Sequence, residues 1–306
     1  MPGGDLMKSL NPEKIKTAKA VSAGFGVYFL WGFTFLASRV AQNYVTPFVL
    51  LAYRFVIASL LLAIPVLLGF EKVRIKGRNI KNLLIIGLFE PCLYFIGEQY
   101  GVRLTNTAFS GVMIAIIPIV TMIFSFIFLK EKPSIGQWIF SAISIAGVII
   151  ITLQEQSTGA VSVIGVLCLV LAVVTGALFT IVSRKLSTDF SVFERTLTTQ
   201  IEGAVFFLLL ALIEHRGNLM QIVTPLANMN FVLAILYLAV FGSVIGYTLF
   251  NYAVANAPTA KVVVLCNLTT VVSVVAGVVI LKEPFTLISA AAILLVLIGI
   301  WGVQKT

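Results

Sequence analysis

Ten long apolar stretches divide the chain, and each has the length that a helix needs to cross a hydrocarbon core of about 30 Å. They lie near residues 18–40, 47–69, 82–102, 105–129, 134–153, 160–183, 192–213, 230–252, 257–281 and 285–303. Hydrocarbon offers the backbone no hydrogen-bond partners, and alternating strand patterns are absent, so each stretch is predicted to be a helix. The sequence therefore predicts an all-α polytopic membrane protein with ten transmembrane helices.

Composition leaves no room for a second kind of domain. Hydrophobic residues make up 59% of the chain and charged residues 11%, and the mean hydropathy is +1.07. Ten spans of about 22 residues take up roughly 220 positions. The remainder is a polar tail over residues 1–17 and brief connectors, so no soluble catalytic domain fits.

The net charge of +9 is a topology signal. With ten spans and both ends inside, the basic clusters all fall on the cytoplasmic side, as the positive-inside rule requires. These clusters are Lys8, Lys14, Lys16 and Lys19, then Lys72, Arg74, Lys76, Arg78 and Lys81, then Lys130 and Lys132, and finally Arg184, Lys185 and Arg195. Nucleic acid is not an expected partner, because these charges do not form one basic face.

Catalytic and metal-binding motifs are not found. The three cysteines, Cys92, Cys168 and Cys266, sit at different places in predicted helices and suit neither a disulfide framework nor a metal set. The sequence has no H-E-x-x-H and no Walker loop, and its one histidine, His215, lies in a predicted outer loop. We expect no enzyme activity, no metal and no cofactor. A carrier without an ATP-binding motif is expected to be secondary-active.

An internal repeat organises the chain. The segment "YGVRLTNTAFSGVMIAIIPIVTMIFSFIFLKEKPSI" from Tyr100 aligns without a gap on "YAVANAPTAKVVVLCNLTTVVSVVAGVVILKEPFTL" from Tyr252. The aligned identities include the "LKE" turns at 129–131 and 281–283, and Gly147 with Gly299. The chain is thus predicted to hold two five-helix units, residues 18–153 and 160–303. Because five is odd, the second unit enters the membrane from the other side, which gives an inverted repeat and the geometry of alternating access.

Several segments together resemble a known family. They are the paired "LKEK…GVIIITL" and "LKEP…IGIWGVQ" segments, "WGFTF" from Trp31, "YRFVIASLLL" from Tyr53, and "IIPIV" around Pro118. They look like the ten-helix EamA branch of the drug/metabolite transporter superfamily, over almost the whole chain. The resemblance implies a carrier in the inner membrane of a prokaryote that moves small organic solutes, often as an exporter, through a cavity lined by several helices. It does not fix the substrate.

Two glutamates interrupt the third apolar stretch, in "LFEPCLYFIGEQYG". At 1.5 Å per residue, Glu90 lies about 12 Å and Glu98 about 24 Å from the inner end. Spacing by four places Glu90, Tyr94 and Glu98 on one face of the helix. A charge at mid-bilayer costs at least about 2.5 to 3.5 kcal/mol, so such residues face a cavity or a partner. No cation is predicted at the depth of Glu90, which favours substrate binding or proton coupling. Glu98 has two interpretations, function or a structural ion pair with Arg54.

Aromatic and polar residues accompany these acids on neighbouring helices. A carboxylate beside aromatic faces suits an ammonium group. The candidate site is Glu90, Glu98, Tyr94, Trp31, Tyr28, Phe95, Tyr247, Asn267 and Thr270, each with core packing or helix–helix hydrogen bonding as the alternative.

The predicted function is a secondary-active carrier of small organic metabolites, amino acids or cationic amines, that works by alternating access as an exporter or proton-linked exchanger. The alternative is an anion carrier of the nucleotide-sugar or sugar-phosphate type, which needs intramembrane basic residues to clamp phosphate. Expected partners are the solute, protons and the lipid bilayer, and the expected state is a monomer or homodimer.

Overall fold

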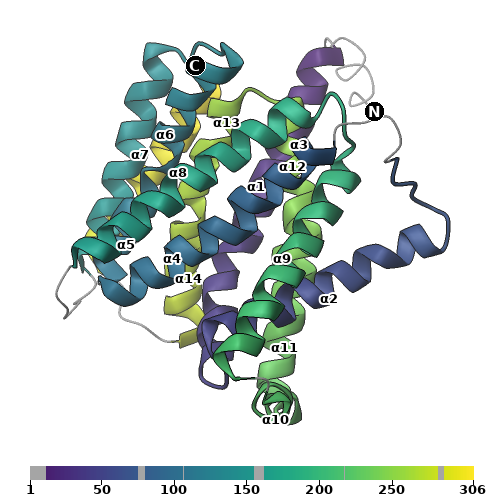
Figure 1. Ribbon diagram of the computed structural model, residues 1–306. Helices are drawn as coiled ribbons and strands as arrows, with labels where there is room; N and C mark the ends of the chain where they lie inside the picture. The colour runs from purple at the N-terminus through teal and green to yellow at the C-terminus, as the bar shows by residue number, and fades with distance from the viewer. Residues whose placement is uncertain (1–11, 75–79, 106, 155–161, 217, 282–285) are drawn as a thin grey trace, which may run out of the picture.

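The computed structural model describes residues 12–74, 80–105, 107–154, 162–216, 218–281 and 286–306. Ten helical segments in these ranges are long and apolar enough to cross a membrane, as the sequence predicted. All regular secondary structure in the described residues is helical (Figure 1). The second "LKE" turn, at Lys282 and Glu283, and residues 1–11 of the predicted tail lie outside the described residues.

Six of the spans are single helices. They are α1 (Pro12–Gln42), α2 (Pro47–Leu67), α7 (Ile135–Gln154), α8 (Val163–Leu186), α9 (Val192–Glu214) and α15 (Leu287–Lys305). α1 begins six residues before the apolar run that predicted it, because a helix satisfies its own backbone hydrogen bonds and can continue beyond the hydrocarbon.

Four spans are interrupted by π or 3₁₀ segments. The third consists of α3 (Ile80–Gly87), η1 (Leu88–Leu93) and α4 (Tyr94–Leu104), and the fourth of α5 (Thr107–Ala115), α6 (Ile117–Phe124) and η2 (Ser125–Leu129). The eighth consists of α11 (Met229–Tyr237), η4 (Leu238–Ile245) and α12 (Gly246–Asn256), and the ninth of α13 (Thr259–Val263), η5 (Val264–Asn267) and α14 (Leu268–Leu281). Short α10 (Leu219–Val223) and η3 (Thr224–Ala227) join α9 to α11.

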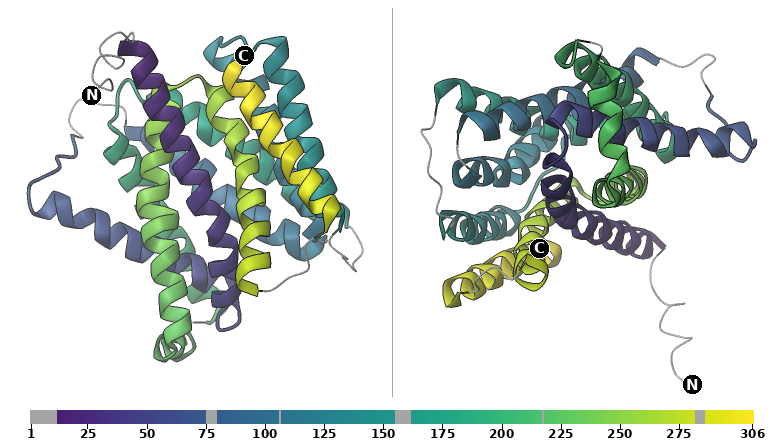
Figure 2. Two further views of the ribbon diagram at one scale, coloured as in Figure 1. Left: turned by 180° about the vertical axis from the view of Figure 1, so that it is seen from behind. Right: turned by 90° about the horizontal axis from the view of Figure 1, so that it is seen from below.

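The strongest helix packings join the two halves of the chain. We call residues 12–154 the N-terminal half and residues 162–306 the C-terminal half. α7 packs along α15, α2 along α9, α4 along α8, and α1 against both α12 and α14. The halves therefore interlock rather than form two separate bundles, as the two views in Figure 2 show.

Small residues allow the closest of these packings. A Cβ atom added to Gly299 of α15 would lie 2.6 Å from the carbonyl oxygen of Phe140 and 2.6 Å from the backbone nitrogen of Ser144, both on α7. A Cβ atom on Gly147 of α7 would lie 2.6 Å from the carbonyl oxygen of Ala292. Such small side chains let helix backbones approach, which is a common basis of helix association in membranes.

The molecule has two distinct ends. The start of α1 and the end of α15 lie at one end, together with α13, and we call this the terminal end (Figure 1). The α1–α2 turn and α10 lie at the other, which we call the opposite end (Figure 1). The charge pattern predicts that the terminal end faces the cytoplasm.

Candidate functional site

A cavity of about 330 Å³ lies inside the helix bundle, with walls from both halves of the chain. Residues of α1, α2, η1, α4, α5 and α6 line it from the N-terminal half, and residues of α8, α12, η5 and α14 line it from the C-terminal half. It leads to the exposed residues Gln42 and Val102 near the opposite end. Ligand pockets in proteins measure about 300–1,000 Å³, so this cavity suits one small solute.

Glu90 lies where the third span breaks. Its backbone is extended, with φ −145° and ψ 122°, and the Glu90–Pro91 peptide bond is cis. Proline has no N–H to donate, so the helical ladder is interrupted here. The side chain is 9% exposed, lines the cavity, and accepts a hydrogen bond of 2.8 Å at Oε1 from the hydroxyl of Tyr247. Glu90 is thus buried and bonded to the other half of the chain.

Glu98 stands two helical turns nearer the opposite end and lines the same cavity. The hydroxyl of Tyr94 donates to Oε1 of Glu98 over 3.1 Å. Glu90, Tyr94 and Glu98 therefore all reach one cavity from a single span, in keeping with their spacing of four residues.

Arg54 has partners other than the one predicted. Its Nε donates to Oγ of Ser243 over 2.8 Å, and Nη2 donates to the carbonyl oxygen of Gly242 over 3.4 Å. The guanidinium carbon lies 5.2 Å from the ring centroid of Phe95, within the range of a cation–π contact. Among the described residues, Arg54 and Glu98 form no ion pair, so the predicted direct pair is wrong.

The reason for this difference lies in the backbone of the eighth span. The carbonyl oxygen of Gly242 points out of the π-helical segment η4 and accepts from Arg54 and, over 2.8 Å, from Nε1 of Trp31. Arg54 is only 6% exposed and lines the cavity together with both glutamates. The site thus holds one guanidinium and two carboxyl groups around the same space.

Trp31 is the centre of an aromatic cluster beside Glu90. Its ring stacks on Phe250, with centroids 5.6 Å apart and planes at 26°. Tyr28 and Tyr247 meet it edge-on, at 5.4 Å and 5.6 Å. Of the nine predicted site residues, seven line the cavity: Glu90, Glu98, Tyr94, Trp31, Tyr28, Phe95 and Tyr247.

The other two predicted site residues, Asn267 and Thr270, are not among those that line this cavity. Asn267 is 2% exposed, and its Nδ2 donates to Oγ of Ser144 over 3.0 Å. This bond to α7 is of the helix–helix kind that was the alternative for this residue. The cavity wall on the ninth span comes instead from Cys266 and Thr269.

Sequence reasoning missed several polar residues that line the cavity: Ser38, Arg39, Gln42, Gln99, Thr180 and Thr269. A signal was present in α1, where Tyr28, Trp31, Phe35, Ser38 and Gln42 follow one another at intervals of three or four and so share a face. No comparable signal marks Thr180 or Thr269.

A larger hollow of about 590 Å³ lies at the terminal end, outside the cavity. Its charged groups are of both signs, and its lining residues are Phe70, Glu71, Lys72, Arg74, Asp189, Ser191 and Glu194. The backbone N–H of Arg74 donates to Oε1 of Glu194 there, over 2.9 Å. Neither Glu90 nor Glu98 lines it, so the smaller cavity is the better candidate site.

Comparison with known proteins agrees with this arrangement. The model of the EamA-like transporter family matches residues 18–153 and 163–304. The uncharacterized transporter YcxC of Bacillus subtilis (strain 168) is 31% identical over 277 residues, which cover 90% of this chain and 89% of the relative. The uncharacterized inner membrane transporter YedA of Escherichia coli (strain K12) is 23% identical over 257 residues, covering 83% and 80%.

A solved crystal structure shares the fold. It superimposes with a TM-score of 0.77 over 94% of this chain and 97% of the other, at 19% sequence identity. The family model and the relative at 31% identity each span most of the chain. The chain therefore belongs to the EamA-like transporter family and is a multi-pass membrane transporter.

Proposed function

We propose that the protein is a secondary-active carrier of small organic metabolites that bear an amino group, and that it exports or exchanges them by alternating access. The observation that carries the proposal is Glu90, which is buried in a cavity with aromatic walls and bonded to Tyr247 of the other half. Buried acids inside membranes commonly mark substrate or proton pathways.

The chemistry of the cavity favours an amino acid over a simple cationic amine. Glu90 and Glu98 supply carboxyl groups for an ammonium group, and Trp31 supplies an aromatic face for it. Arg54 faces the same space and can bind a carboxylate in a planar, two-pronged contact. A zwitterion satisfies both sets of groups, whereas an amine leaves Arg54 without a ligand.

Two observations support the inverted repeat that alternating access requires. The family model matches the chain twice, at residues 18–153 and 163–304. The π segments η1 and η4 interrupt the third and eighth spans at aligned positions, because Glu90 and Gly242 are 152 residues apart, as are Tyr100 and Tyr252. Broken helices at matching positions of two halves are typical of substrate sites in secondary carriers.

Proton coupling follows from having one buried acid for two ligands. When a proton and an ammonium group compete for Glu90, binding of one displaces the other, and rocking of the halves carries them in opposite directions. The basic connectors support a cytoplasmic terminal end, and with that orientation the cavity opens to the outside. The membrane is the cytoplasmic membrane of a prokaryote.

One chain builds the whole cavity, so a monomer suffices and a homodimer is compatible with it.

The test begins with a thermal-shift screen of the purified protein against amino acids, amines, nucleosides and sugar phosphates. The solute that stabilises the protein is then used for flux into liposomes at several pH values. Glu90→Gln should keep the melting temperature without solute and lose the pH-dependent flux. Glu71→Gln, which neutralises an exposed carboxylate at the terminal end, is the matched control and should transport normally.

Two results would contradict the proposal. Flux that still responds to pH in the Glu90→Gln protein would leave Glu90 a packing residue. Stabilisation by sugar phosphates and not by amino acids or amines would favour the anion carrier instead.

A further inference from the structure

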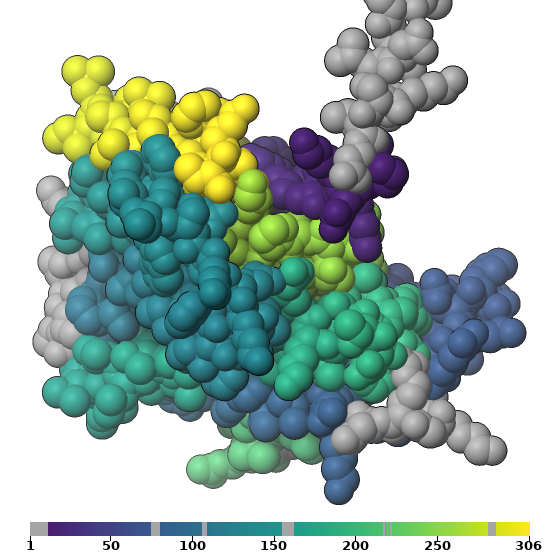
Figure 3. All heavy atoms as spheres, turned by 90° about the horizontal axis from the view of Figure 1, so that it is seen from above, coloured from purple at the N-terminus to yellow at the C-terminus, as the bar shows by residue number. Residues whose placement is uncertain are grey.

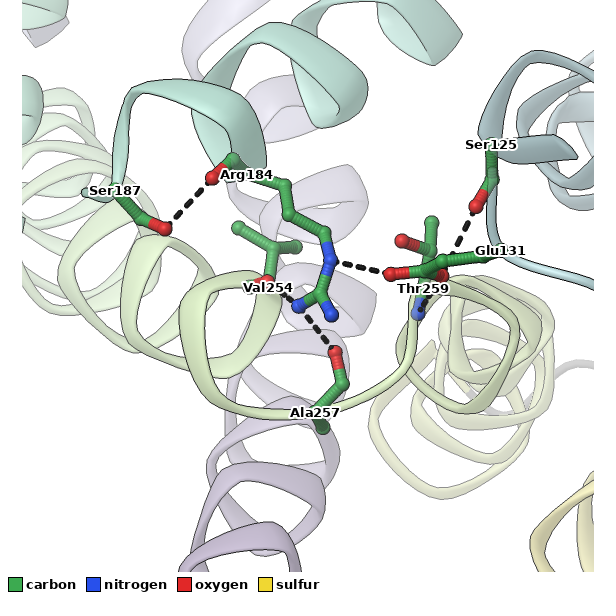
Figure 4. A network of polar contacts seen from close by, with 7 residues as sticks. All are labelled: Ser125, Glu131, Arg184, Ser187, Val254, Ala257 and Thr259. Atoms are coloured by element: carbon green, nitrogen blue, oxygen red, sulfur yellow. Dashed lines mark hydrogen bonds and ion pairs between the residues drawn. The ribbon is translucent and has the colours of Figure 1, made fainter. Parts of the chain in front are cut away.

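The carboxylate of Glu131 joins the two halves of the chain at the terminal end. Glu131 follows η2 and belongs to the N-terminal half. Its Oε1 forms an ion pair of 2.5 Å with Nε of Arg184, at the end of α8 (Figure 4). Its Oε2 accepts a hydrogen bond of 2.9 Å from the backbone N–H of Thr259, the first residue of α13. Glu131 therefore joins two separate elements of the C-terminal half.

The charges match the helix ends that they meet. Nη1 of Arg184 donates to the carbonyl oxygens of Val254 and Ala257, over 2.5 Å and 2.6 Å, at the C-terminal end of α12. A cation at a helix C-terminus and an anion at a helix N-terminus are both favoured by the helix dipole. Arg184 thus links α8 to the C-terminal end of α12. The negative charge of Glu131 lies at the N-terminal end of α13, which is the positive end of the helix dipole.

An apolar layer lies beside this polar contact and also joins the halves. Met122 of α6 is fully buried against Ala260 and Val263 of α13, which are 4% and 1% exposed. In the view onto the terminal end, segments of the two halves meet across this face (Figure 3). The cavity that opens at the opposite end is therefore closed here by contacts between halves.

The hydrogen bonds around Glu131 fall into two groups. Ser125 Oγ donates to Glu131 over 2.9 Å inside the N-terminal half, and Arg184 bonds Val254 and Ala257 inside the C-terminal half. These bonds each lie within one half, so a movement of Glu131 away from Arg184 and Thr259 leaves them intact. Of the bonds around Glu131, those with Arg184 and Thr259 join the two halves, so these are the ones that must break on opening.

We propose that Glu131 is a latch that holds the cavity closed at the terminal end, and that its contacts with Arg184 and Thr259 break each time the carrier opens to that side. The proposal rests on the alternating access proposed above. The side chains of Arg184 and Glu131 are 24% and 23% exposed, so water can replace the partners when they separate. A partly exposed pair is weak enough to open repeatedly, unlike a fully buried one.

The test measures opening without transport. In a cysteine-free background, Lys132→Cys and Lys185→Cys place spin labels on exposed residues next to the two latch residues, one in each half. Electron–electron resonance in nanodiscs then gives the distribution of distances between them. Glu131→Gln keeps an oxygen acceptor and removes the charge. Thr259→Pro removes the N–H donor, together with a buried side-chain hydroxyl that has no hydrogen-bond partner. Proline is well tolerated at this first helical position, and the preceding residue has a ψ of 137°, which suits it.

We expect each variant to raise the ratio of long to short distances, by about tenfold for Glu131→Gln, the change that loss of a charge-assisted hydrogen bond implies. Asp189→Asn, which neutralises an exposed carboxylate at the same end, should leave the distribution unchanged. If Glu131→Gln and Thr259→Pro both give the parental distribution, Glu131 is not a latch. A shift to long distances in a protein that carries none of the screened solutes would support the latch and contradict the proposed transport of amines and amino acids.

Discussion

Tyr247 donates its hydroxyl proton to Oε1 of Glu90 over 2.8 Å, so that one hydrogen bond joins the two halves of the chain at the cavity wall. The acid stands on the broken third span and the donor on α12. The ring of Tyr247 is held separately, by edge contacts with Trp31 at 5.6 Å and Phe179 at 5.9 Å. The hydroxyl can therefore be removed without removing the packing.

Tyr247→Phe is expected to lower flux about tenfold at solute concentrations below saturation, because a hydrogen bond to a charged group contributes about 1.5–3 kcal/mol. The measurement is initial flux in liposomes for Tyr247→Phe, Glu90→Gln and the double variant. The double variant should transport no less than Glu90→Gln, since both changes remove one interaction.

Tyr53→Phe is the control for this comparison of single and double variants. It removes a hydroxyl that donates to the carbonyl oxygen of Ile222 over 2.9 Å, away from the cavity lining. Its flux should equal that of the parent. If the fold-losses of flux in the two single variants multiply in the double variant, Tyr247 and Glu90 act independently.

Arg54→Gln should separate amino acids from amines. The guanidinium is the group proposed to bind a carboxylate, so apparent affinity for a transported amino acid should fall about tenfold or more, as loss of a charge-assisted contact implies. Affinity for the amine that lacks only the carboxylate should change less than about twofold. Competition of each unlabelled compound against labelled flux gives both values.

Arg103→Gln is the matched control, because Arg103 is exposed on α4 and does not line the cavity. It should leave both affinities unchanged. An equal loss for the amino acid and the amine in Arg54→Gln would show that Arg54 supports the fold of the site rather than contacting the carboxylate.

Cysteine labelling checks the orientation of the two ends. Asn43→Cys lies in the α1–α2 turn and Lys132→Cys after η2, and both positions are exposed. In intact cells, a membrane-impermeant maleimide should label Asn43→Cys and not Lys132→Cys, because the basic connectors are predicted to be cytoplasmic. The background must lack the native cysteines, since Cys266 lines the open cavity. The reverse labelling pattern would overturn the predicted topology.

Gly299→Ala should destabilise the α7–α15 packing. The new Cβ atom would meet backbone atoms of Phe140 and Ser144 at 2.6 Å, and backbone cannot move aside as a flexible side chain can. We expect a loss of about 1–3 kcal/mol, measured as unfolding in mild detergent. Gly26→Ala in α1 is the control, because its Cβ atom would lie 3.4 Å from the side chain of Leu249. It should be neutral or gain up to about 1 kcal/mol from helix propensity. Equal stability of the two variants would contradict close packing at Gly299.

The positions of the ten spans could be predicted because the bilayer imposes a local rule. Each span needs about 20 apolar residues whatever its neighbours are, so hydropathy alone locates it. Glu90, Tyr94 and Glu98 share a face for the same local reason, since helical spacing depends only on position in the chain. The break at Glu90 also had a local signal in Pro91.

The partners of charged residues could not be predicted in this way. Arg54 was assigned to Glu98 by depth, yet it bonds Ser243 and Gly242 of the other half. Arg195 was counted among the cytoplasmic charges, yet it is 1% exposed and bonds Ser183 and Asn251. Both guanidinium groups reach carbonyl oxygens on helices far away in sequence, and which carbonyls are near depends on how the helices pack.

The sequence by itself therefore determined the all-helical membrane fold, the ten spans and the acidic face of the third span, because these follow from local hydropathy and helical period. Only the tertiary structure decided that Glu90 meets Tyr247, that Asn267 bonds Ser144 away from the cavity, and that Glu131 meets Arg184 and Thr259. Those contacts join residues more than 50 positions apart, and their geometry is set by side-chain packing and exposed backbone carbonyl and N–H groups, which no periodic pattern in the chain records.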